Sequence, residues 1–290
     1  MKKIIKTNFH SLKDLLDLVD KKDPIWLREL ESRKKGGRDW RGTDSWEETM
    51  NLVKYGWPEG RKNLTKAINI FIQEQRYSLN PFLSLDVCGA FPNVPRYVAG
   101  DPTHMFNYVR EIKGSVKVIN LIAYVTSSAS VSGQEKINWG AALVSIIDNL
   151  ETTGYSINML WVSASKPSRG YDGPNVILSY DLKPAGTYLD YDKLSFWLIN
   201  PSTLRRIELS FKERLEIERW YGDGYGIPFE ASELRNYFDE DYIILNGSKG
   251  ANSVEKGYEM IQGDFNAHFE NLNLVSPIID LQDNDRRTHL

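Results

Sequence analysis

Cysteine is almost missing from this sequence, since Cys88 is the only one among 290 residues. A lone cysteine excludes an internal disulfide framework and a structural zinc site of the cysteine type. No apolar run approaches the roughly 18 residues that a membrane-spanning helix needs. The amino terminus, Met1-Lys-Lys-Ile-Ile-Lys, lacks the apolar stretch and small-residue cleavage site of a secretion signal. We therefore expect a cytoplasmic protein.

Recognisable catalytic motifs are lacking as well. There is no Walker A motif, no H-E-x-x-H, no G-x-S-x-G, and no G-x-G-x-x-G after a strand. The glycines of Gly222–Gly226 follow a predicted helix, which is the wrong context for a dinucleotide site, so they predict a loop. The histidines show no metal-ligand spacing, and only His104, close to Asp101, is placed to act as a base or ligand. We lean toward a protein that is not an enzyme and has no cofactor.

The composition is that of a folded protein, with 41% hydrophobic and 26% charged residues. The formal net charge is −3, with basic residues in excess over residues 1–62 and acidic residues in excess over residues 228–290. A protein that coats nucleic acid would be basic overall, so this chain offers at most a local basic patch.

Hydrophobic periodicity and capping residues predict the secondary structure. Ser11 and Ser45 stand at helix N-cap positions, and Gly56 and Pro58 end one helix and lead into the next. Three prolines and two glycines limit residues 83–105 to a short strand followed by an ordered loop. The other predicted elements are strands over 117–126, 155–162 and 176–182, and helices over 46–55, 138–151, 191–199 and 204–219.

The strand, helix and strand over residues 117–162 predict a βαβ crossover and hence a parallel sheet. We therefore expect a three-layer, mainly parallel α/β core, similar to von Willebrand A or Rossmann-type domains, over residues 40–225. Residues 1–39 are expected to form a helical N-terminal arm. An irregular C-terminal segment, residues 226–290, is expected to pack on the core.

A loop rich in hydroxyl groups follows the first predicted central strand, with Thr126, Ser128 and Ser130 at alternate positions. Ligands of open α/β sheets bind beyond the carboxyl ends of strands, which is where this loop stands. The layout resembles the von Willebrand factor A family, whose D-x-S-x-S loop holds a divalent metal for partner binding. Thr126 replaces the aspartate, and the missing carboxylate weakens the case for a divalent cation. The alternative is a loop that caps the following helix.

Several short sequence segments elsewhere in the chain resemble those of an uncharacterised family of bacteriophage-encoded proteins. They are Gly42-Thr-Asp-Ser-Trp-Glu-Glu48, Gly56-Trp-Pro-Glu-Gly60, Asp86-Val-Cys-Gly-Ala-Phe-Pro-Asn-Val-Pro-Arg96, Gly100-Asp-Pro102 and Asn200-Pro-Ser-Thr-Leu-Arg-Arg206. The similarity spans about residues 40 to 220. It implies a viral origin, and so a location in the infected host cell, but no activity.

Polar residues in the proline-rich loop form a second candidate site. Asp86 and Asp101 flank Arg96 along the chain, and two carboxylates with a guanidinium suit a metal ion or a phosphate group. The alternative, which we favour, is structural: Asp101 forms the turn of Gly-Asp-Pro, and Arg96 and Asp86 satisfy each other.

A basic stretch with an interleaved tryptophan is the third candidate, and it is also the clearest linker in the sequence. Such a stretch meets phosphates and stacks a base in some nucleic-acid-binding proteins, but most such runs are solvated linkers. Its candidate residues are Arg33, Lys34, Lys35, Arg38, Trp40 and Arg41.

Two functional interpretations follow. The first is a non-enzymatic phage interaction protein that binds a protein partner through the strand-end loops at Thr126–Ser130 and Asp86–Asp101. The second is a nucleic-acid-associated protein of phage replication or recombination that uses the basic stretch, with metal-assisted chemistry at Asp86 and Asp101. The absence of a complete catalytic constellation favours the first.

Overall fold

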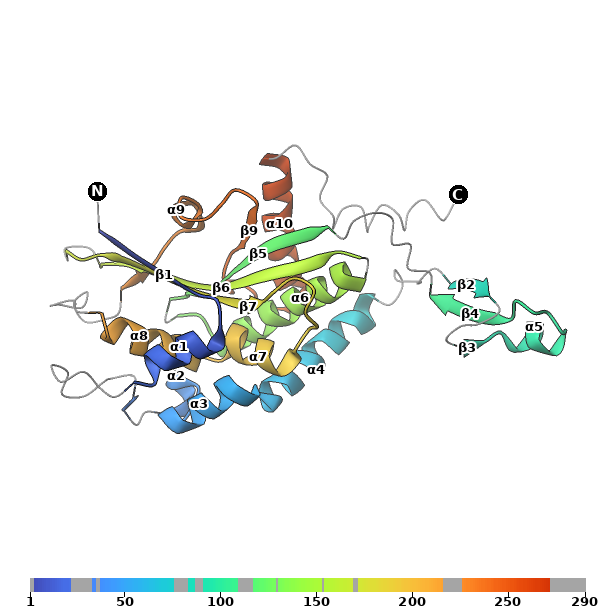
Figure 1. Cartoon of the computed structure of the whole chain (residues 1–290), viewed down its shortest axis with the longest axis horizontal. Coiled ribbons are helices and arrows are strands. Elements are labelled where there is room, and N and C mark those ends of the chain that lie inside the picture. Colours follow the sequence, from blue (N-terminus) through green and yellow to red (C-terminus); the bar gives the residue numbers. More distant parts are fainter. Residues whose placement is uncertain are drawn as a thin grey trace.

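The computed structural model describes residues 3–21, 33–34, 37–75, 83–86, 91–108, 117–128, 130–152, 154–168, 172–215 and 226–271. Its centre is a six-stranded sheet with helices packed against it (Figure 1). The strand order is β1 (Ile4–Phe9), β7 (Asn175–Lys183), β6 (Ser156–Lys166), β5 (Val118–Tyr124) and β9 (Tyr242–Leu245). A short strand, β8 (Ile227–Pro228), pairs with the end of β6.

The predicted βαβ crossover is confirmed. Strand β5 runs parallel to β6, and α6 (Gly133–Thr152) connects them. Strand β9 lies on the other side of β5 and is also parallel to it. The carboxyl ends of β5, β6 and β9 therefore meet at one edge of the sheet.

The sheet is mostly parallel, as expected, but it is mixed rather than uniformly parallel. Strands β6 and β7 pair antiparallel, whereas β1 and β7 are parallel to each other. The reason is the length of the connection, since only residues 167–174 lie between β6 and β7. A parallel pair needs a crossover of about a dozen residues or more.

The terminal segments are less irregular than the sequence suggests. Strand β1 was not predicted, although α1 (Leu12–Val19) begins at Ser11 as expected. Residues 38–41, expected in a linker, form the short helix α2 (Arg38–Arg41). The C-terminal part supplies β8, β9, α9 (Ala231–Arg235) and the long helix α10 (Val254–Asn271). The central sheet therefore takes strands from all three predicted segments.

Two hydrophobic clusters lie on opposite faces of the sheet. The larger one joins the sheet to most of the helices, including α3 (Trp46–Tyr55), α4 (Pro58–Gln75), α6, α7 (Tyr191–Ile199) and α10. Side chains alternate along a strand, so Leu121 and Ala123 point into this cluster while Ile122 and Tyr124 point into the smaller one. Figure 1 shows α4, α6 and α7 on one side of the sheet and α9 on the other.

The helix predicted over 204–219 is divided. A π-helical turn, η2 (Thr203–Glu208), leads into α8 (Leu209–Glu213), and residues 216–219 lie outside the described part of the chain. Upstream, the Asn200 carboxamide oxygen accepts hydrogen bonds from the N–H and the hydroxyl of Ser202. Wider π turns occur mostly as short insertions, often at functional sites.

A separate small sheet is built from β2 (Leu83–Asp86), β4 (Met105–Tyr108) and β3 (Phe91–Pro92), with the short helix α5 (Val94–Val98) between β3 and β4. Both strand pairs are antiparallel. The predicted short strand is confirmed as β2, whereas the residues expected to form a loop supply β3, α5 and the start of β4. Figure 1 shows it apart from the central sheet.

Candidate functional site at the carboxyl end of the central strands

The loop after β5 lies at the edge where the parallel strands end. Ser132 begins α6: its hydroxyl accepts the Glu135 N–H at 3.2 Å, and the Glu135 carboxylate accepts the Ser132 N–H at 2.8 Å. This capping box satisfies the N–H groups of Ser132 and Glu135. Glu135 also accepts the N–H of Gly250 at 2.8 Å, which ties the loop after β9 to the start of α6.

The three hydroxyls predicted to form a ligand loop are engaged with the protein. Thr126 Oγ1 lies 2.9 Å from Ser163 Oγ of β6 and accepts the N–H of Ala164 at 2.9 Å. Ser128 Oγ and Ser130 Oγ lie 2.6 Å apart. The cap of α6 is Ser132 rather than any of these three. The contacts of Thr126 with Ser163 and Ala164 continue the pairing of β5 with β6 beyond the end of β5, and so they fix the start of the loop.

Charged side chains are buried between α6 and the η2–α8 segment. Glu208 forms an ion pair with Lys212 one turn later, and both side chains are buried. Lys136 lies at the end of the first turn of α6 and is only 7% exposed. We call the buried residues Lys136, Glu208 and Lys212, together with the half-buried Arg205, the buried charge cluster. Burial of several charges is costly, so such clusters often mark functional sites.

Lys136 is the unusual member of this cluster. Burial and, to a smaller extent, the nearby positive charge of Arg205 lower the pKa of its amine to about 8, whereas Glu208 acts in the opposite direction. Gly140 lies one turn after Lys136 on the same face of α6. The backbone there is so close to the end of α7 that a Cβ added at Gly140 would lie 2.6 Å from the Ile199 side chain. Lys136 therefore points toward the end of α7 and the start of η2.

The basic stretch packs on the same region. The Trp40 carbonyl accepts a hydrogen bond from the Arg205 guanidinium, which also lies over the indole ring at 4.7 Å. Arg41 lies over that ring at 5.5 Å, and Trp40 remains 49% exposed. Aromatic and cationic groups from two distant parts of the sequence thus meet beside Lys136.

The other candidate nucleic-acid residues hold the protein together. Arg38 bonds Asp44 at 2.7 Å and Glu48 at 2.8 Å. Arg33 donates to the Val19 and Lys21 carbonyls and lies over the Trp46 ring. The Lys34 carbonyl accepts from Arg206 at 3.3 Å, and Lys35 lies outside the described residues.

The proline-rich loop is closed on itself. Arg96 pairs with Asp101 at 3.1 Å, and Asp101 accepts the N–H and the hydroxyl of Thr103, each at 2.8 Å. These hydrogen bonds lower the pKa of the Asp101 carboxyl. The backbone of Asp86 is in β2, but its side chain is outside the described part.

The two predicted ligand loops are far apart. The small sheet joins the central sheet through residues 109–116, which lead into the amino end of β5, whereas Thr126 follows the carboxyl end of that strand. Figure 1 accordingly shows the small sheet at the end of the central sheet where β5 begins. Asp86–Asp101 and Thr126–Ser130 therefore do not form one site.

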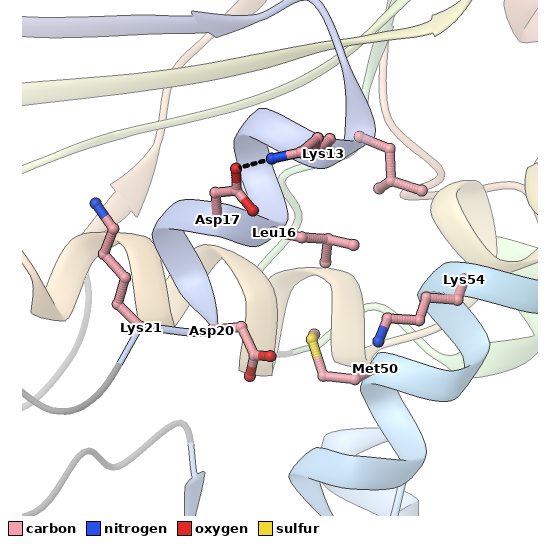
Figure 2. Close-up of a pocket in the computed structure, with 8 residues that line it drawn as sticks. Lys13, Leu16, Asp17, Asp20, Lys21, Met50 and Lys54 are labelled. Carbon is pink, nitrogen blue, oxygen red and sulfur yellow. Dashed lines mark hydrogen bonds and ion pairs between the residues drawn. The ribbon is translucent and has the colours of Figure 1, made fainter.

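A groove of about 540 Å³ lies between α1 and α3 (Figure 2). Its floor is apolar and its rim carries the ion pair of Lys13 and Asp17. The residues that line it are Leu12, Lys13, Leu16, Asp17, Asp20, Lys21, Met50 and Lys54.

Within the described ranges, no three His, Cys, Asp or Glu side chains are grouped as a metal site would require. His104 Nδ1 lies 2.7 Å from the Asp101 carbonyl, which holds it in the turn. In the same part of the chain, no helix is both long and apolar enough to cross a bilayer.

Sequence reasoning missed the buried charge cluster. A glutamate and a lysine one turn apart on a helix usually pair on its exposed face, yet Glu208 and Lys212 are buried. The available signal was that Glu208 and Lys212 stand next to the apolar positions Ile207 and Phe211. Nothing in the sequence distinguishes Lys136 from an exposed lysine.

Fold and site together define an α/β protein with a mixed six-stranded sheet and a buried charge cluster beyond the carboxyl ends of its parallel strands. Over residues 1–276 the chain matches the family described as Domain of unknown function (DUF7192), and it belongs to that family. No curated protein and no solved structure matches it.

Proposed function

We propose that this is a non-enzymatic interaction protein that binds a protein partner through the small three-stranded unit. The observation that carries the proposal is the exposure of three large apolar side chains on α5. Val94, Tyr97 and Val98 are 60%, 63% and 78% exposed. Their spacing of three and four residues puts them on one helix face, and clustered apolar side chains mark interaction sites more often than single ones do.

The turn that presents these side chains is well ordered, which supports the proposal. The Asn93 side chain caps α5 at the Arg96 N–H, and the Asn93 N–H donates to the His104 carbonyl at 2.6 Å. The Tyr97 and His104 rings contact edge to face at 5.1 Å. With the ion pair of Arg96 and Asp101, these contacts hold the apolar face in one conformation, which lowers the entropic cost of binding.

Two finer parts of this proposal rest on resemblance. One is that the chain is encoded by a bacteriophage. The other is that the β5–α6–β6 unit is a degenerate von Willebrand A arrangement in which the Thr126–Ser130 loop provides a second contact. The parallel crossover supports the latter, whereas the antiparallel pairing of β6 with β7 departs from an all-parallel core.

The experiment is affinity capture from cells that produce the protein, with matched variants. We expect Val94→Ser combined with Val98→Ser to abolish capture of a partner that the unchanged protein binds. Tyr188→Ser is the control, because Tyr188 is 84% exposed and lies on a loop of the central domain. Failure to capture any partner, or equal capture by both variants, would contradict the proposal.

A further inference from the structure

Within the described part of the chain, the Lys136 amine has no hydrogen-bond or ion-pair partner. The residue is nevertheless only 7% exposed. The amine is not fully enclosed by protein atoms. Trp139 Nε1 and Ser165 Oγ are fully enclosed without a hydrogen-bond partner, whereas Lys136 Nζ is not one of these atoms. A buried lysine normally finds a carboxylate or several carbonyl oxygens, because an unpaired charge is costly in the protein interior.

The nearest charged side chains do not compensate the positive charge of Lys136. Arg205 is a second cation, and its contacts are with the carbonyl and the ring of Trp40 rather than with a carboxylate. Glu208 is close enough to act on the amine, but its carboxylate is already paired with Lys212. The buried charge cluster therefore holds three cations and one anion, an excess of positive charge that an anionic ligand would complement.

The position of these cations fits a ligand site. Lys136 is in the first turn of α6, which follows the carboxyl end of β5, and Glu208 is near enough to act on Tyr124 at that end. Open α/β sheets bind their ligands beyond such strand ends. The Arg205 guanidinium offers a fork of donors and the Lys136 amine a point charge, a combination that suits a tetrahedral oxyanion. The N–H groups of Ser132 and Glu135 at the start of α6 take no part, because each bonds the other residue's side chain.

We propose that Lys136 and Arg205 bind a phosphoryl group, either free phosphate or the phosphate of a small ester. A nucleic-acid backbone fits less well, because Arg33 and Arg38 of the basic stretch are engaged within the protein and leave no continuous track of free cations. This site is separate from the apolar face of α5, so the test of phosphate binding is independent of the test of partner binding.

The test is titration with inorganic phosphate, followed by calorimetry and by the melting temperature, against sodium chloride at the same ionic strength. We expect a saturable rise in melting temperature with phosphate alone, since a ligand that binds the folded state stabilises it by mass action. Lys136→Met and Arg205→Gln should each weaken binding by about tenfold or more, because each removes a charge-assisted contact. Lys66→Met is the control, since Lys66 is exposed on α4.

Arg205 is half-buried, so Arg205→Gln keeps the test informative if Lys136→Met does not fold. Adenosine monophosphate and glucose 6-phosphate show whether the ligand is free phosphate or an ester. If both bind more weakly than inorganic phosphate, the ligand is free phosphate. If either binds more tightly, the ligand is an ester. No saturable response to phosphate, or unchanged affinity in both variants, would overturn the proposal. So would a preference for oligonucleotides whose binding falls steeply with salt and persists in both variants.

Discussion

Glu208 and Lys212 form an ion pair in which the two side chains are only 6% and 3% exposed. They stand one turn apart at the junction of η2 and α8, and the larger hydrophobic cluster includes their neighbours Ile207 and Phe211. A pair this deeply buried is weak evidence for stability, because the desolvation of both ions offsets their attraction. Removing one partner leaves the other as an uncompensated charge.

The first prediction concerns this pair. Glu208→Leu alone or Lys212→Met alone should lower the free energy of unfolding by about 3–5 kcal/mol, because each leaves one buried charge. The double variant should recover most of that loss, since no charge remains. Urea denaturation of the four proteins gives the coupling energy. Losses that simply add in the double variant would be incompatible with a buried pair.

The second prediction concerns the pH dependence due to Lys136. Its folded-state pKa, about 8, lies below the ordinary value of 10.5, so between these pH values the unfolded chain binds more protons than the native protein. Stability should therefore rise as the pH increases from 8 to 10.5. Lys136→Met should be more stable than the unchanged protein at pH 7 by up to about 3 kcal/mol, and the difference should shrink over that pH range. A constant difference would contradict the assignment.

The third prediction concerns Asp264 on α10. Burial raises the pKa of its carboxyl from 3.8 to about 6, although hydrogen bonds from the Asn246 N–H and side chain oppose the shift. Between these pH values the native state binds more protons than the unfolded chain, so stability should fall as the pH rises from 4 to 6. Relative to Asp264→Asn, the unchanged protein should lose up to about 3 kcal/mol over that range.

Asp264→Asn removes the titration and keeps the size of the side chain. The measurement is urea denaturation of both proteins at closely spaced pH values. Parallel pH profiles for the two proteins would show that Asp264 titrates normally.

The fourth prediction concerns Gly42, which ends α2 with a φ of 80°. A methyl group there would lie 2.4 Å from Asn200 Oδ1 and 2.9 Å from the backbone N of Ser202. Gly186 is a matched control, because its φ is 77° and nothing lies within 4 Å of the same position. Gly186→Ala should cost about 1 kcal/mol for the left-handed conformation.

Gly42→Ala should cost about 1–3 kcal/mol more than this control, because the end of α2 must move away from Asn200 and Ser202. Thermal and urea denaturation of the two variants measure the difference. Equal losses in both would mean that the close packing of Gly42 against Asn200 is not required.

Local signals accounted for much of the secondary structure. Helices α3 and α7 have the predicted bounds, and Ser11, Ser45 and Asp190 cap their helices through side-chain hydrogen bonds. The β5–α6–β6 crossover was also predicted, because a long apolar strand, a helix and a second strand of that length have few other arrangements. Strand β1 was missed because its partner β7 lies more than 160 residues away in the sequence, beyond the reach of any local pattern.

The candidate site residues also divide into those that are close together in the sequence and those that only the fold brings together. The sequence identified the hydroxyl loop after β5 and the turn at Asp101, because both depend on residues that are close along the chain. It expected Arg96 to pair with Asp86, whereas Arg96 pairs with Asp101. It could not identify the juxtaposition of Lys136, Arg205 and Trp40, which come from α6, η2 and α2. Such a grouping depends on how three helices pack.

By itself, therefore, the sequence determined the α/β class, the bounds of α3 and α7, and the crossover, since these follow from periodicity, capping and connection length. Only the tertiary structure decided the mixed strand order, the burial of Lys136 beside Glu208 and Lys212, and the exposure of the apolar face of α5. The physical reason is that burial and charge compensation are properties of a side chain's surroundings. Those surroundings are assembled from segments that no short stretch of sequence brings together.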